Sequence, residues 1–264
     1  MNKLLLIGLS VLVIVGGGAG IYFGVFDSDS ADLLRAEEGS LVIPDTPAID
    51  SNSPQVVEKP LPKYKGQALR FVGNDPSIQN LTPEVLAAKK DELNKFAEIA
   101  EKNPSDALAW LKISEVKKFF NNYKGSADAL EYLRLLSPDD FIVNLNLGNL
   151  YGFYLNDYKK AEQNFQAAIN NSGGYELVAA VLSLADLYKD FYKEKYDQVD
   201  DVLLSGIKGA PDDLNLVLKL AFYYKEVNDK KNAIKYFERF LSMPGSSGAQ
   251  QQAIEDEIVN LNKS

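Results

Sequence analysis

Apolar residues recur every three or four positions through most of the chain beyond residue 82, and this spacing predicts amphipathic α-helices. The clearest example is the stretch LNLGNLYGFYLNDYKKAEQNFQAAI, residues 145–169. There the small residues Gly148 and Ala161 alternate with the large residues Tyr151 and Phe165. A small residue at a fixed place indicates that a second backbone comes close, so the pattern predicts helices packed in pairs.

The first helix of this region is expected at 83–102. Thr82 is a residue typical of an N-cap and Pro83 suits a first helical turn, while Asn103 and Pro104 end the pattern. An apolar stripe at helical spacing runs along this segment: Leu86, Leu93, Phe96, Ile99 and Ala100.

The region that follows repeats itself with a regular period that is typical of helical repeat proteins. Pro104 and Pro138 lie one period apart, whereas Tyr151, Tyr188 and Tyr224 are spaced slightly more widely, so short insertions separate the later units. Each unit is expected to form two helices joined by a tight turn. Such a pair buries its apolar faces only by stacking on further copies, which predicts a solenoid.

These positions resemble the motif of the tetratricopeptide repeat family. The best match consists of Leu147, Gly148, Tyr151, Tyr158, Ala161, Phe165 and Ala168. The last repeat matches with Leu220, Ala221, Tyr224, Ala233, Phe237 and Pro244. Three features depart from the motif: Lys117 and Lys230 stand where tyrosines are expected, and the third repeat carries two extra residues near Phe191.

The first residues of the chain predict a membrane anchor. Residues 4–26 carry no charge and are long enough to span a hydrocarbon core of roughly 30 Å. Because Lys3 precedes the segment, the N-terminus is expected in the cytoplasm and the rest of the chain outside. A cleaved secretory signal, with 4–15 as its apolar part, is the alternative, but the apolar run continues beyond Gly20 and favours an uncleaved anchor.

Gly16, Gly20 and Gly24 lie four residues apart within this anchor, a pattern that allows two membrane helices to approach closely. We therefore expect a surface for self-association there, although glycine is also common in membrane helices.

The stretch between anchor and repeats is rich in proline, serine and aspartate, which predicts a flexible linker over 27–80. Within it, QALRF at 67–71 is expected to form a short extended piece. The resemblance implies an all-α fold: a right-handed superhelical solenoid of about four helix-turn-helix repeats with end-cap helices, preceded by a single transmembrane helix. The expected domains are the anchor 1–26, the linker 27–80 and the repeat domain 81–264, with repeats at about 105–138, 139–172, 175–211 and 212–244 and a cap helix at 246–262.

Composition restricts the chemistry further. The chain has no histidine and no cysteine, which excludes a Ser-His-Asp or Cys-His catalytic set and a thiolate metal site. A net charge of −9 disfavours nucleic acid as a partner. The segment 186–201 is dense in carboxylates and tyrosines, but alternating charges at helical spacing are typical of a solvated helix face. We expect no enzyme activity, no cofactor and no metal.

The family resemblance implies that the first helix of each pair lines a concave groove that binds a peptide or a helix. Asparagine there can pair with a peptide backbone of any sequence, and phenylalanine can accept apolar side chains. A clamp for a charged chain terminus is not expected, because Leu111 and Glu115 occupy places where it needs Lys and Asn. The expected groove residues are Lys112, Glu115, Phe119, Asn146, Asn149, Phe153, Asp186, Lys219 and Phe222.

The sequence thus predicts a membrane-anchored scaffold or adaptor that binds other proteins through its exported repeats. An ancillary chaperone subunit of a protein-export or envelope-assembly complex is the alternative. A structural protein that associates with itself is a third hypothesis.

Overall fold

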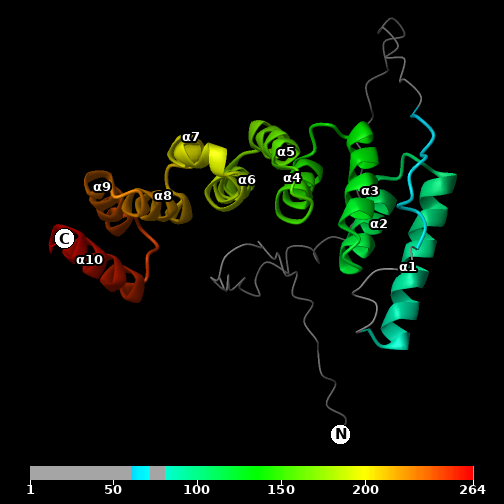
Figure 1. Cartoon of the computed structure of the whole chain (residues 1–264), viewed down its shortest axis with the longest axis horizontal. Helices are drawn as coiled ribbons and strands as arrows, with labels where there is room; N and C mark the ends of the chain where they lie inside the picture. Colours follow the sequence, from blue (N-terminus) through cyan, green and yellow to red (C-terminus); the bar gives the residue numbers. More distant parts are fainter. Residues whose placement is uncertain (1–60, 72–80, 264) are drawn as a thin grey trace, which may run out of the picture. The chain divides into compact units, whose positions relative to one another are not determined.

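The computed structural model describes residues 61–71 and 81–263, which all belong to one compact unit. Within these residues the regular structure is entirely helical, which confirms the expected all-helical repeat architecture (Figure 1). The predicted anchor at 4–26 and its glycines lie outside the described residues. Among the helices that are described, none combines the length and apolarity needed to cross a bilayer.

The helices follow one another as successive pairs, each packed against its neighbours in the chain. After α1 (Pro83–Lys102), the first pair is α2 (Ala107–Phe119) with α3 (Tyr123–Leu136). The second pair is α4 (Phe141–Asn149), continued by η4 (Leu150–Tyr154), with α5 (Tyr158–Asn170). The third is α6 (Gly174–Asp186), continued by η5 (Leu187–Phe191), with η6 (Lys193–Gln198) and α7 (Val199–Gly209). The fourth is α8 (Leu214–Glu226) with α9 (Lys230–Ser242), followed by α10 (Gly248–Lys263).

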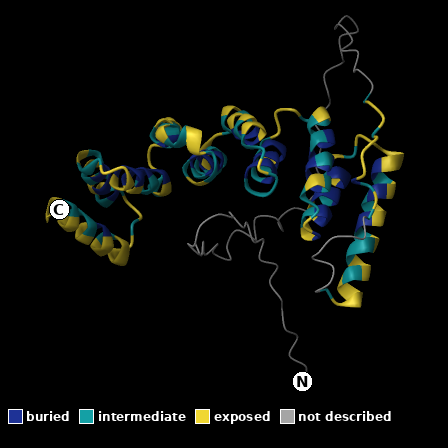
Figure 2. Ribbon diagram, in the orientation of Figure 1, coloured by how far each residue is buried: buried dark blue, intermediate teal, exposed yellow. Residues whose placement is uncertain are grey.

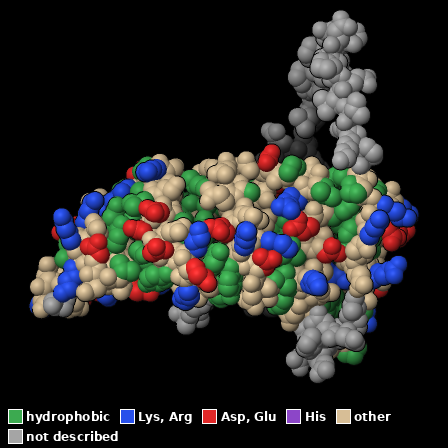
Figure 3. Space-filling model, turned by 45° about the horizontal axis from the view of Figure 1, so that its top comes forward, with side chains coloured by type: hydrophobic (Ala, Val, Ile, Leu, Met, Phe, Trp, Pro, Cys, Tyr) green, Lys and Arg blue, Asp and Glu red, His purple; other side chains and the backbone are tan. Residues whose placement is uncertain are grey.

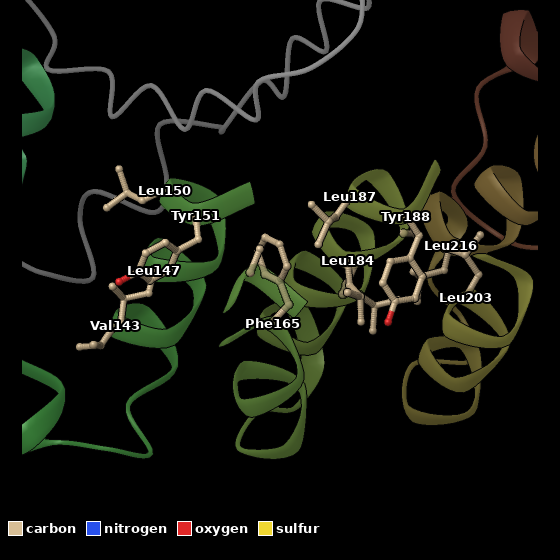
Figure 4. Packing of buried hydrophobic residues seen from close by; sticks show 14 of the residues in the cluster. Val143, Leu147, Leu150, Tyr151, Phe165, Leu184, Leu187, Tyr188, Leu203 and Leu216 are labelled. Carbon is tan, nitrogen blue, oxygen red and sulfur yellow. The ribbon is translucent and has the colours of Figure 1, made fainter. Parts of the chain in front are cut away.

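Each helix buries one side against its neighbours and leaves the other side to solvent (Figure 2). The small residues act as predicted. A Cβ atom on Gly148 would lie 2.5 Å from a ring carbon of Phe165, so α4 and α5 cross closely only because this side chain is absent. Figure 4 shows Phe165 among the leucines and tyrosines of the neighbouring first helices.

Asparagines shape the turn inside three of the four pairs. Asn121, Asn156 and Asn228 adopt the left-handed conformation, with φ of 54°, 56° and 61°, which asparagine tolerates better than most residues. The next residue then caps the second helix: the side chain of Asp157, for example, accepts a hydrogen bond from the Lys160 amide at 3.2 Å. The same local sequence therefore reverses the chain in the first, second and fourth pairs.

The extra residues of the second and third pairs are accommodated in wide helical turns. The Leu155 amide donates to the Leu150 carbonyl at 2.9 Å, and the Tyr192 amide donates to the Leu187 carbonyl at 2.7 Å. These bonds span five residues instead of four, so each turn holds one residue more than an α-helix would. In the third pair a 3-10 helix over 193–198 then leads into α7, at the place where the sequence predicts an insertion near Phe191.

A tyrosine from each later first helix reaches back to the preceding second helix. Tyr151 donates to Glu131 at 2.9 Å and Tyr224 donates to Asp200 at 3.2 Å. The hydroxyl of Tyr188 donates to Glu162 in the same way. These hydrogen bonds tie each pair to the next and give the motif tyrosine a defined partner.

The first pair differs because a segment outside the helices covers it. We call residues 61–71 the strap. These residues are expected to belong to the flexible linker, but they pack against α2 and α3, and Ala68 is fully buried. The expected extended piece at 67–71 is a turn, with the Arg70 amide bonded to the Gln67 carbonyl at 3.1 Å.

Aromatic contacts hold the strap in place. The ring of Tyr64 lies 4.8 Å from Trp110 and 5.4 Å from Tyr132, and the Tyr132 hydroxyl donates to the Pro62 carbonyl at 2.9 Å. Lys117, which replaces the motif tyrosine, donates to the Arg70 carbonyl. At the later interfaces, the motif tyrosine contacts the second helix of the preceding pair. In the first pair, the strap takes the place of that helix. Lys117 can donate to a backbone carbonyl of the strap, which explains why a lysine suits this position.

Candidate functional site

The predicted groove residues lie on the first helices of the four pairs. We call the surface formed by these residues and their neighbours on α2, α4–η4, α6–η5 and α8 the first-helix face. Equivalent positions on consecutive helices lie one repeat apart, as Leu111 and Leu145 do. The same spacing relates Lys112 to Asn146, so the face repeats along the array.

On α2 the two predicted charged residues pair with each other. The Lys112 ammonium lies 2.8 Å from a carboxylate oxygen of Glu115, and this hydrogen bond raises the pKa of Lys112. Phe119 lies at the end of the helix, where the Lys89 ammonium of α1 is 5.3 Å from its ring centre. The helix α1 therefore borders the first-helix face.

On α4 the two predicted asparagines lie nearly one helical turn apart. Asn146 donates its side-chain amide to the Ile142 carbonyl at 2.9 Å, which leaves its carbonyl oxygen Oδ1 free as an acceptor. Asn149 is half-buried, and no side-chain hydrogen bond occupies it within the described residues. Both amides are therefore available to a bound backbone.

Phe153, the third predicted residue of the second pair, packs against two other aromatic rings. Its ring lies 5.2 Å from Phe191 and 6.1 Å from Phe165, so it fills the space between the second and third pairs. It is half-buried in this packing. The helical pattern predicts the face on which Phe153 lies but not the direction of its ring.

Between α6 and α8 the structure brings two predicted residues together. Lys219 forms an ion pair with Asp186, whose side chain is only 19% exposed. Burial raises the pKa of Asp186, and this effect outweighs the opposite effect of Lys219. The two residues thus satisfy each other across the boundary between pairs.

Two further ion pairs that the sequence did not predict follow on the same side. Lys189 of η5 lies 2.8 Å from Glu226, and Lys225 lies 2.6 Å from Glu257 of α10. Burial acts to raise the pKa of Glu226, but its hydrogen bonds from Lys189 and Tyr196 leave that pKa lowered. In the sequence, these pairs are visible only as opposite charges about one repeat apart. Exposed helices often show such spacing, so it does not by itself predict an ion pair.

Apolar side chains on the first-helix face are exposed at several places. Phe222 is 41% exposed although its ring packs at 5.1 Å against Phe237. Leu108 and Ile142, each the second residue of its helix, are 59% and 51% exposed. Leu108 and Ile142 are not among the predicted groove residues, although they occupy equivalent places one repeat apart.

The first-helix face presents charged, amide and apolar side chains near one another. Within 61–71 and 81–263 no group of three acidic, cysteine or histidine side chains is placed to hold a metal ion. On the side shown in Figure 3, Lys and Arg side chains lie among Asp and Glu side chains, with apolar areas between them.

The comparisons with known proteins support the repeats. A model of the tetratricopeptide repeat matches residues 143–173 and 215–246, which are parts of the second and fourth pairs. These two segments therefore match the tetratricopeptide repeat, in agreement with the helical pairs of the structure. No curated protein matches the sequence.

One solved structure with a TM-score above 0.5 supports the fold. The chain is similar to the structure titled "Functional Characterization of Pseudomonas Aeruginosa pilF", with 15% identity, a TM-score of 0.51, and coverage of 75% of this chain and 85% of the other. It also matches PilW, described as a type IV pilus biogenesis factor, with 15% identity, a TM-score of 0.48, and coverage of 68% and 82%. A crystal structure of MamA matches with 14% identity, a TM-score of 0.49, and coverage of 72% and 99%.

Proposed function

We propose that the chain is a scaffold or adaptor that binds a segment of another protein on its first-helix face. The observation that carries the proposal is the repeated exposure of apolar side chains there, with Leu108 and Ile142 both more than half exposed. Exposed apolar residues gathered on one surface are typical of protein interaction sites. Asn146 and Asn149 add hydrogen-bonding groups that pair with a backbone irrespective of its sequence.

We propose in addition that residues 4–26 anchor the chain in a membrane and that the repeats are exported. The support is the uncharged length of this segment and the lysine that precedes it. Extraction of membranes with alkaline carbonate tests the anchor: the full chain is expected to stay in the pellet, and a chain without residues 4–26 in the supernatant. Release of both chains would contradict the anchor.

The binding function is tested by crosslinking in intact cells. A tagged full-length chain is compared with the double variant Asn146→Ala/Asn149→Ala. One or a few defined partners that disappear in the variant would support the adaptor. A broad mixture of exported chains together with channel subunits would support the chaperone alternative instead. Recovery of the chain alone would favour self-association, including through Gly16, Gly20 and Gly24.

A further inference from the structure

The strap is held by side chains of the first pair that are not among the predicted groove residues. They are Trp110 and Lys117 of α2, and Asp128 and Tyr132 of α3, and we call these four side chains the strap site. Trp110 is fully buried and Lys117 is 2% exposed. The strap site is therefore a second contact surface of the repeats, and a segment of the chain itself occupies it.

Tyr64 is the centre of this contact. Its ring lies 4.8 Å from that of Trp110 and 5.4 Å from that of Tyr132. Its hydroxyl donates to a carboxylate oxygen of Asp128 and accepts from the Ala68 amide at 2.8 Å. Among the aromatic side chains, only tyrosine has a hydroxyl that donates and accepts at once. The strap site thus recognises both the ring and the hydroxyl of a tyrosine.

Two small residues follow Tyr64 at fixed spacing. A Cβ atom on Gly66 would overlap a carboxylate oxygen of Asp128, so this packing requires glycine two positions after the tyrosine. Ala68, four positions after the tyrosine, is fully buried. A larger side chain there would overpack the contact between strap and helices. The site therefore restricts three positions of the segment that it binds.

Two further hydrogen bonds reach the backbone of the strap. The Tyr132 hydroxyl donates to the Pro62 carbonyl at 2.9 Å, and the Lys117 ammonium donates to the Arg70 carbonyl. Every residue has a backbone carbonyl, so these contacts position the segment without selecting its side chains.

The contacts define a short recognition pattern, Tyr-x-Gly-x-Ala. The side chains at its two variable positions, Lys65 and Gln67, are exposed. Phe71 adds an aromatic ring seven positions after the tyrosine, 5.2 Å from the ring of Phe120. A pattern of this length is short enough for a loop or linker of another protein to carry it.

The strap is a preformed turn. The Ala68 amide bonds to the Tyr64 hydroxyl, and the Arg70 amide bonds to the Gln67 carbonyl at 3.1 Å. A segment that already holds its bound shape loses less conformational entropy on binding. If the strap left without a replacement, the buried ammonium of Lys117 would lose the Arg70 carbonyl, which is costly. Exchange of one such turn for another is therefore favoured over an empty site.

The first pair has contacts of its own that do not involve the strap. The Ser114 and Ser126 hydroxyls form a hydrogen bond between α2 and α3 at 2.8 Å. The indole N–H of Trp110 donates to the Pro104 carbonyl at 2.9 Å. These bonds hold the two helices in place irrespective of what occupies the strap site.

We propose that the strap site is a binding site for a tyrosine-containing turn, which residues 61–71 occupy within the chain and which a partner protein with the same pattern occupies by displacing them. The site is separate from the first-helix face, and the inference does not rest on the function proposed for that face. The partner segment is expected to carry Tyr-x-Gly-x-Ala in a turn.

The test uses the full-length chain in mild detergent and a labelled peptide with the sequence of residues 61–71, read by fluorescence anisotropy. Since the linked strap competes at an effective concentration on the order of millimolar, weak binding to wild type is expected. Tyr64→Ala weakens the strap and is expected to raise the affinity for the peptide at least about tenfold. Tyr64→Phe removes only the hydroxyl, and a rise of about fivefold is expected.

Trp110 gives an independent signal, because it is the only tryptophan of the chain and the peptide contains none. Its emission in the Tyr64→Ala chain is expected to shift to shorter wavelength when the peptide binds, since the tyrosine ring of the peptide covers it again. An unchanged spectrum at saturating peptide would place the peptide elsewhere and overturn the assigned site.

Matched controls test the recognition pattern on the Tyr64→Ala chain. Peptides with alanine in place of the tyrosine, or valine in place of the glycine, are expected to bind at least about tenfold more weakly. Addition of Asp128→Ala to the chain is expected to weaken the unaltered peptide about tenfold. Asp212→Ala, which changes an exposed aspartate before α8, is expected to leave its binding within about twofold.

Three results would overturn the inference. If neither Tyr64→Ala nor Tyr64→Phe binds the peptide more tightly than wild type, the strap is a fixed part of the fold; circular dichroism checks that the chains remain helical. Equal binding of the unaltered peptide and the peptide without tyrosine would refute the pattern. Size-exclusion chromatography of Tyr64→Ala mixed with Asp128→Ala is expected to match each chain alone. A larger species in the mixture alone would assign the displacing turn to a second copy instead of a partner.

Discussion

The hydroxyl of Tyr151 donates a hydrogen bond to the carboxylate of Glu131 at 2.9 Å, from the first helix of the second pair to the second helix of the first. Glu131 is also held by Arg134 at 2.5 Å, so its charge is shared between a phenol and a guanidinium. Tyr188 and Tyr224 repeat the contact at the next two interfaces. The same hydrogen bond from a tyrosine to a carboxylate therefore recurs at three otherwise apolar interfaces between neighbouring helix pairs.

Tyr151→Phe is expected to reduce the free energy of unfolding by about 1 kcal/mol, because the ring remains packed and only one hydrogen bond is lost. Urea denaturation followed by circular dichroism measures the change. Tyr175→Phe is the control, since Tyr175 is 82% exposed and its substitution is expected to have no effect. Equal stability of wild type and Tyr151→Phe would show that the bond is not a net stabilising contact.

The interface tyrosines and the neighbouring Tyr223 predict that the protein loses stability at alkaline pH. Burial, followed by the nearby charge of Asp200, raises the pKa of Tyr223 to about 12, and the pKa values of Tyr151, Tyr188 and Tyr224 are raised as well. An unfolded chain releases its tyrosine protons near pH ~10. The native state then binds more protons than the unfolded state, so stability is complete below this pH and is lost as pH rises toward the folded values.

Tyr223→Phe separates this effect from that of the lysines, which titrate in the same range. Relative to wild type, the variant is expected to gain about 1 kcal/mol between pH ~9 and pH ~11, because it lacks one proton-linked group. Urea denaturation at both pH values gives the difference. A stability difference that does not change with pH would show that Tyr223 titrates normally.

The sequence predicts the helices well because their causes are local. Gly148 and Phe165 are visible as a small and a large residue at repeat spacing, and the structure brings them into contact. Thr82 caps α1 as expected, with its hydroxyl accepting from the Val85 amide at 3.4 Å. Periodicity and capping residues therefore carry most of the information about the fold.

Contacts between segments that are distant in the sequence have no such local signal and were not predicted. Nothing local in residues 61–71 indicates that Tyr64 lies against Trp110, because their contact depends on how the chain returns across α2 and α3. Lys117 was visible as a departure from the motif, but its partner was not. The pairing of Asp186 with Lys219 likewise depends on the stacking of two pairs, which fixes distances that the sequence alone leaves open.

The strap gives a spectroscopic prediction, because Trp110 is the only tryptophan of the chain and is fully buried. Tyr64→Ala removes a ring that covers it, together with the hydrogen bond from the Ala68 amide to the Tyr64 hydroxyl at 2.8 Å. The emission of Trp110 is expected to shift to longer wavelength, with a loss of about 3 kcal/mol in stability. Unchanged emission would show that the strap does not shield Trp110 in solution. Tyr175→Ala serves as the control.

The ion pair of Asp186 and Lys219 gives the last prediction. Lys219→Met leaves a carboxylate that is 19% exposed without its counterion, so a loss of about 1–3 kcal/mol is expected near pH ~7. Because burial already raises the pKa of Asp186, removal of the lysine raises that pKa further. A raised folded pKa means that stability is retained below the unfolded value near ~4 and is lost as pH rises through the folded value.

The loss in free energy of unfolding of Lys219→Met relative to wild type is therefore expected to be smaller at pH ~4 than at pH ~7. At pH ~7 the unpaired carboxylate would have to remain charged. Urea denaturation at the two pH values measures it. The double variant Asp186→Asn/Lys219→Met removes both charges and is expected to lie closer to wild type at pH ~7 than the single variant does. The loss of stability in Lys219→Met could instead be equal at both pH values and unchanged by the Asp186→Asn substitution. That result would show that Lys219 stabilises the protein through the packing of its side chain and not through its charge.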